Sequence, residues 1–106
     1  MTTAADAAAQ QTFIVVATMR DDANFAELAA LRADEEKQLE VLHSLGRLGS
    51  HHVAPARGTV FLEVIAADEE HVAEVLATLP FHRFFEADVY PISDPAVANA
   101  ALQADA

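Results

Sequence analysis

A glutamate interrupts an apolar helical stripe in the first half of the chain. Glu35 lies four residues after Leu31 and four before Leu39. On a helix it therefore lies in the same apolar stripe as these leucines, facing the sheet. A carboxylate on such a face is partly removed from water, and desolvation raises its pKa toward the range useful to a general base. We therefore predict that Glu35 is a catalytic base. The alternative is a slightly rotated helix that leaves Glu35 at the solvent boundary.

Two consecutive histidines, His51 and His52, lie in a segment with weak strand character. Neighbouring strand residues point to opposite faces, so one imidazole is expected to face the helices or a cavity and the other the far side of the sheet. Imidazole is suited to proton transfer near neutral pH, which makes either residue a catalytic candidate. Because the two side chains diverge, they are a weak metal-binding signal, and we predict no metal site. Packing or simple surface exposure is the alternative.

Three further residues are candidates for binding a substrate. Arg57 follows the histidine strand in a turn, and a guanidinium near a pocket is suited to an anionic group, although pairing with a local acid is the alternative. Glu63 lies in a hydrophobic strand, either as a second inward carboxylate or at an oligomer contact. His82 belongs to an aromatic cluster at 81–85 that either lines a pocket or packs in the core.

The elements that must position these side chains follow the order βαββαβ. β-Branched runs and helical periodicity predict strands at 12–19, 47–54, 59–66 and 87–92 and helices at 25–45 and 69–79. This order is typical of the ferredoxin-like α+β fold, an antiparallel sheet with both helices on one face. Pro91 favours an edge position for the last strand. We expect a disordered leader at 1–11, one domain at 12–93 and an Ala-rich tail at 94–106, either a short helix or loose.

The sheet face opposite the helices is expected to be apolar as well, because both faces of the strong strands carry Val, Ile, Phe and Leu. A contiguous apolar face of that kind indicates a partner. The simplest partner is a second copy packed sheet against sheet, so we predict a homo-oligomer.

Composition restricts the remaining possibilities. The 106 residues carry a formal net charge of −11 with only six Lys and Arg, which makes nucleic acid and anionic membrane surfaces poor partners. No apolar run approaches the ~20 residues of a transmembrane helix. The absence of cysteine excludes disulfides and thiolate chemistry and fits a cytoplasmic protein. The three glycines are not grouped, so no phosphate loop or dinucleotide fingerprint is present.

Three stretches resemble the muconolactone isomerase family. Leu31–Gly46 looks like the first helix of that family, Thr59–Val64 looks like one of its strands, and Leu79–Phe81 resembles its Leu-Pro-aromatic turn. The resemblance extends over about Phe13 to Pro95. It implies a ferredoxin-like dimeric α+β barrel that forms homo-oligomers and uses no metal or organic cofactor.

The same resemblance implies an activity, the movement of a proton within an unsaturated lactone that bears a carboxylate. Glu35 falls at the position of the family's helix acid, and His51 and His52 fall where the family carries a Trp-Arg pair. We therefore expect a cofactor-free isomerase or cyclase acting on a small unsaturated lactone, enone or polyketide-like substrate. The alternatives are a non-catalytic ligand-binding or interaction domain and a cofactor-free monooxygenase of the same fold.

Overall fold

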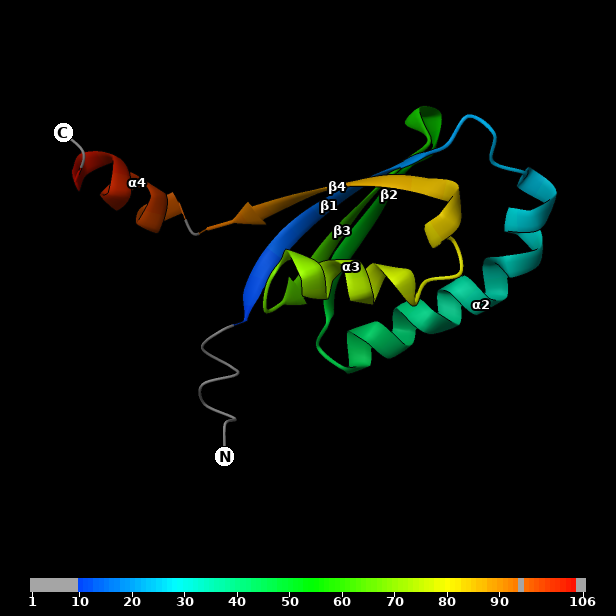
Figure 1. The fold of residues 1–106 in the computed structure, drawn as a ribbon, viewed down its shortest axis with the longest axis horizontal. Helices are drawn as coiled ribbons and strands as arrows, with labels where there is room; N and C mark the ends of the chain where they lie inside the picture. Colours follow the sequence, from blue (N-terminus) through cyan, green and yellow to red (C-terminus); the bar gives the residue numbers. More distant parts are fainter. Residues whose placement is uncertain (1–9, 94, 105–106) are drawn as a thin grey trace.

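The computed structural model describes residues 10–93 and 95–104, and these form an α+β domain of the ferredoxin-like type. Along the chain the elements are β1 (Gln11–Met19), α2 (Phe25–Ser44), β2 (Leu48–Ala54), β3 (Thr59–Ala66), α3 (Glu69–Ala77), β4 (Phe85–Ile92) and α4 (Pro95–Ala104). The four strands form one antiparallel sheet in the order β2-β3-β1-β4. Helices α2 and α3 both lie on one side of it (Figure 1). The predicted ferredoxin-like α+β fold with an antiparallel sheet is confirmed.

The core lies between the sheet and the two helices. Strand β1 alternates strictly, with Phe13, Val15 and Ala17 buried on the helix side. Its central neighbour β3 contributes Leu62 and Val64 to the same layer. Burying apolar side chains from both central strands against one helix layer supplies the main driving force for this fold.

Local capping defines both helices. The side chain of Asn24 accepts hydrogen bonds from the backbone N–H groups of Ala26 (2.9 Å) and Glu27 (3.1 Å), which fixes the start of α2. Helix α2 ends just before Gly46, whose φ of +72° is the left-handed conformation expected of a terminating glycine. Asp68 caps α3 by accepting from the N–H of His71 at 2.8 Å.

Seven of the twelve predicted element boundaries match the structure, and the other five differ by one or two residues. The largest extension is at β4, which begins at Phe85 rather than residue 87, because Phe85 still pairs with Met19 in the β1 ladder. Strand β4 lies at the sheet edge, as Pro91 predicted, since a residue without a backbone N–H is tolerated there.

The predictions for the two chain ends are only partly covered by the structure. Strand β1 begins at Gln11, within the predicted leader, and residues 1–9 lie outside the described residues. Of the predicted Ala-rich tail, Pro95–Ala104 forms α4, which projects beyond the end of β4 and away from the other helices (Figure 1). No helix in the described ranges is long and apolar enough to cross a bilayer.

Candidate functional site

A cavity of about 860 Å³ lies on the helix side of the sheet, within the size range of small-molecule sites. Its walls come from all four strands, from α2 and α3, and from the segment that leads into β4. The apolar residues that line it are Ala17, Leu39, Val53, Val60, Leu62, Ala73, Leu76, Leu79, Phe81, Phe85, Ala87 and Val89. The polar residues that line it are Arg20, Arg32, Glu35, Glu36, His51, His82 and Glu86. Most of the wall is therefore apolar, with a few ionisable groups.

Glu35 is the deepest ionisable group of this site. Helix α2 buries Leu28, Glu35 and Leu42, which are spaced by seven residues and so lie on one face. Glu35 is 8% exposed and is the one charged residue that is buried within the described ranges. The sequence-based prediction that Glu35 faces inward is confirmed, and the solvent-boundary alternative is wrong.

A single hydrogen bond holds the Glu35 carboxylate. Its Oε1 accepts from the backbone N–H of Phe81 at 2.9 Å. Burial raises the pKa of Glu35, and the hydrogen bond from Phe81 opposes this rise without cancelling it. In the described part of the chain, Oε2 of Glu35 has no hydrogen-bond partner. Every fully buried side-chain nitrogen or oxygen atom in that part of the chain does have a partner, so Oε2 is not fully buried. Because Glu35 lines the cavity, we expect Oε2 to be the oxygen that a bound molecule would reach.

A bulge in β2 decides which of the two histidines faces the cavity. Leu48 pairs with Val64, but His51 pairs with Leu62, so β2 advances by three residues where β3 advances by two. Leu48 is buried on the helix side, and simple alternation would have put His52 on that side too. The extra residue reverses the alternation, and His51 lines the cavity instead.

The carboxylate of Glu63 braces this bulge. Its Oε1 accepts a hydrogen bond from the backbone N–H of Ser50 at 3.1 Å. A Cβ atom on Gly49 would overlap the Glu63 carboxylate, so the bulge requires glycine while this carboxylate keeps its place. Glu63 and His52 both lie on the sheet face away from the helices. Glu63 pairs with Ile14 of β1, and His52 pairs with Phe61 of β3. The structure does not bring either residue to the cavity.

Of the three predicted substrate-binding residues, His82 alone lines the cavity. It lies in a short 3-10 helix, His82–Phe84, between Phe81 and Phe85, whose rings stack with centroids 6.4 Å apart. Arg57 lies exposed in the 3-10 turn Pro55–Arg57 and is not part of the cavity wall.

Four further charged residues, Arg20, Arg32, Glu36 and Glu86, line the cavity, where sequence patterns alone did not place them. Arg20 Nη1 lies 3.6 Å from a Glu86 carboxylate oxygen, and its Nε donates to the backbone carbonyl of Arg83. Arg32 Nε lies 3.5 Å from Glu36 one turn further along α2. The second pair has the (i, i+4) spacing that predicts it, whereas the first requires knowledge of the β1–β4 register.

No protein-family model matches this chain, and no curated protein matches it in sequence. No cluster of three or more His, Asp or Glu side chains suited to a metal ion occurs among residues 10–93 and 95–104. The geometry of the cavity is therefore what indicates a function.

Proposed function

We propose that this protein is a cofactor-independent isomerase or cyclase-type enzyme that shifts a proton on a small unsaturated lactone, enone or polyketide-like compound. One observation carries the proposal, the buried carboxylate of Glu35 at the wall of a largely apolar cavity. Its raised pKa brings it closer to the working pH, where a general base is most effective. The resemblance to muconolactone isomerases implies the same class of chemistry.

The proposed reaction needs no redox partner. Glu35 Oε2 takes a proton from the carbon next to the substrate carbonyl, and the electron pair of that C–H bond forms a dienolate. The protonated Glu35 then returns the proton to the far end of the conjugated system, and the carbonyl is restored. The hydrogen bond from Phe81 to Oε1 keeps the carboxylate oriented through both steps.

A dienolate oxygen needs a hydrogen-bond donor, and two cavity residues are suited to that role. His51 enters from β2 and His82 from the turn before β4. An imidazole N–H directed at the developing negative charge stabilises the transition state, and an apolar cavity strengthens this effect.

Proton NMR in deuterated water tests the proposal. We would incubate the protein with muconolactone and, separately, with 3-cyclohexenone, using buffer alone and Glu35→Gln as controls. The expected result is double-bond migration or deuterium incorporation that is at least ~100-fold slower with Glu35→Gln. Equal rates with both proteins would exclude Glu35 as the base.

The Glu35–Phe81 hydrogen bond also favours a second candidate, a ligand-binding domain without catalysis. In that case Glu35 serves only to hold the segment before β4 against α2. Ligand binding without proton exchange would select this candidate. The third alternative, a cofactor-free monooxygenase, predicts consumption of dioxygen during turnover, which an oxygen electrode measures.

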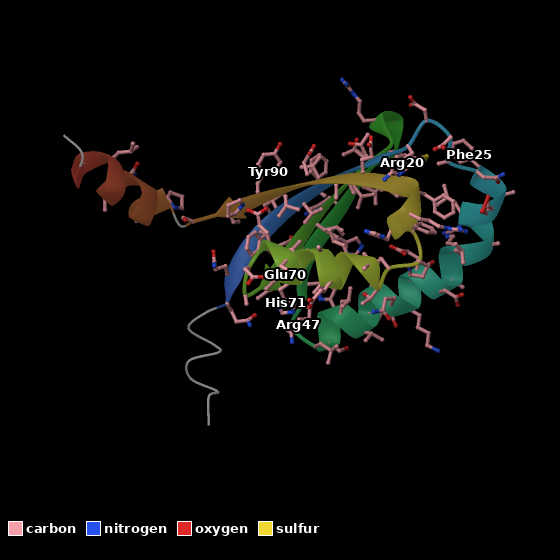
Figure 2. The ribbon with its side chains drawn as sticks, viewed as in Figure 1. Arg20, Phe25, Arg47, Glu70, His71 and Tyr90 are labelled. Atoms are coloured by element: carbon pink, nitrogen blue, oxygen red, sulfur yellow. The ribbon has the colours of Figure 1, made fainter. Side chains whose placement is uncertain are left out.

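We also propose that a second copy covers the sheet face opposite the helices. This face carries half-buried or exposed apolar side chains, and Figure 2 shows Tyr90 of β4 pointing away from the helices. The strand registers align four residues in one row across the face, in the order His52, Phe61, Val16 and Asp88.

The order of the residues in this row supports a second copy that is related to the first by a two-fold axis. His52 and Asp88 lie at opposite edges of the sheet, on β2 and β4. A two-fold axis parallel to the strands would lay each row on its copy in reverse order. His52 would then meet Asp88 of the other copy, and the two apolar residues would meet in the middle. A self-complementary face of this kind favours a homodimer over an unrelated partner.

A further inference from the structure

The charges around the cavity cancel locally. Two of the six Lys and Arg residues line it, Arg20 and Arg32. Each has a cavity-lining glutamate as its partner, Glu86 at 3.6 Å and Glu36 at 3.5 Å. With Glu35 ionised, the wall holds two guanidinium groups against three carboxylates.

The arginine geometry is also unfavourable for a carboxylate ligand. Bidentate recognition uses two neighbouring N–H groups of one guanidinium. The Nε of Arg20 is already occupied by the carbonyl of Arg83 at 3.2 Å, and its Nη1 faces Glu86. The Nε of Arg32 faces Glu36. A ligand carboxylate would therefore compete with a glutamate of the protein for each guanidinium, in a chain whose net charge is −11.

The rest of the cavity is suited to a ligand without charge. Its buried wall includes Ala17, Leu62, Leu76 and Leu79, and the stacked rings of Phe81 and Phe85 lie beside them. Apolar cavities with aromatic lining residues bind unsaturated ring systems through burial and aromatic contact.

We propose that the cavity selects uncharged, largely apolar carbonyl compounds and discriminates against carboxylates, because Glu86 and Glu36 neutralise its two arginines. This inference rests on the proposed function for the carbonyl group, and it defines the substrate class of that site. It departs from the carboxylate-bearing lactone that the family resemblance implies.

Equilibrium dialysis at neutral pH tests the selectivity with three matched probes: 2-acetylnaphthalene, 6-acetyl-2-naphthoic acid and the methyl ester of that acid. The ester controls for the size of the added group, and the acid adds a negative charge. The chain has no tryptophan, so naphthyl absorbance reports the bound fraction directly. We expect the ketone and the ester to bind, and the acid to bind about tenfold more weakly than the ester.

Glu86→Gln provides the decisive variant. It frees the Arg20 guanidinium, so the ratio of the affinity for the acid to the affinity for the ester should rise about fivefold above the wild-type ratio. Glu74→Gln is the matched control, because Glu74 lies exposed on α3 outside the cavity wall and removes the same net charge. It should leave both affinities unchanged.

The outcomes separate this inference from the proposed function. An acid that binds wild-type protein as tightly as the ester overturns the selectivity, as does an acid-to-ester ratio that Glu86→Gln leaves unchanged. Failure of all three probes to bind overturns it as well. Ketone binding with the expected selectivity but without Glu35-dependent proton exchange supports the inference and rejects the catalytic proposal.

Discussion

The Oε1 atom of Glu35 accepts a hydrogen bond from the backbone N–H of Phe81 at 2.9 Å, which joins the middle of α2 to the segment that enters β4. The two residues are 46 positions apart in the chain. This contact fixes one oxygen of the only buried charged side chain in the described ranges and leaves the other without a hydrogen-bond partner there. It gives Glu35 a structural role alongside its proposed catalytic one, and suitable substitutions separate the two.

Glu35→Gln should change how stability depends on pH. Burial raises the pKa of Glu35 in the folded state, so the folded protein holds this proton more tightly than the unfolded chain does. Wild-type stability should therefore fall relative to Glu35→Gln as pH rises from about 4.5 through the raised pKa. Each unit by which the pKa is raised corresponds to about 1.4 kcal/mol. Urea denaturation followed by circular dichroism across this range measures the difference, and parallel pH profiles would contradict it.

Glu35→Leu should be less stable than Glu35→Gln. A glutamine oxygen still accepts from Phe81, whereas leucine leaves that N–H without its acceptor at a half-buried position. We expect a difference of about 1–3 kcal/mol in the free energy of unfolding, measured by urea denaturation at neutral pH. Equal stability of the two variants would show that water from the cavity replaces the lost acceptor.

The two adjacent histidines should differ in their effect on turnover. His51 lines the cavity and His52 lies on the opposite face, so His51→Gln should slow proton exchange about 10- to 100-fold and His52→Gln should leave it near wild type. The NMR exchange assay measures both. A larger effect of His52→Gln would mean that β2 has a different register in solution.

Gly49 and Glu63 should show coupled effects on stability. Gly49→Ala puts a Cβ where the Glu63 carboxylate lies, so it should destabilise the wild type by about 1 kcal/mol or more. In a Glu63→Ala background the space is free, and the same change should cost less. The double-mutant cycle measures the coupling, for which about 0.5–3 kcal/mol is expected between contacting residues. Additive effects would indicate that Glu63 does not brace the bulge.

Phe61→Asp should dissociate the proposed homodimer. Phe61 is 40% exposed at the centre of the face that a second copy would cover, so a carboxylate there opposes sheet-to-sheet packing. Phe25→Asp is a matched control, since Phe25 is 73% exposed at the start of α2. Light scattering coupled to size exclusion should show a monomer for Phe61→Asp and a dimer for the control. A monomeric wild type would reject the second copy as the partner.

The sequence by itself determined the elements and the identity of the central acid. Helix caps at Asn24 and Asp68, the terminating Gly46 and the alternation in β1 act over a few residues, so their patterns are visible locally. The inward position of Glu35 follows from its place in the stripe of α2, because helical periodicity is fixed by backbone geometry. These patterns were sufficient to predict the βαββαβ order and the antiparallel sheet.

Only the tertiary structure decided which other groups accompany Glu35. The bulge at Gly49 and Ser50 reverses the alternation of β2, and it turns His51 rather than His52 toward the cavity. Its brace, Glu63, acts from a different strand. The contacts of Phe81 with Glu35 and of Arg20 with Glu86 join segments far apart in the chain. Such contacts depend on strand register and on how helices rest on the sheet, and one residue of register moves every side chain of a strand to the other face.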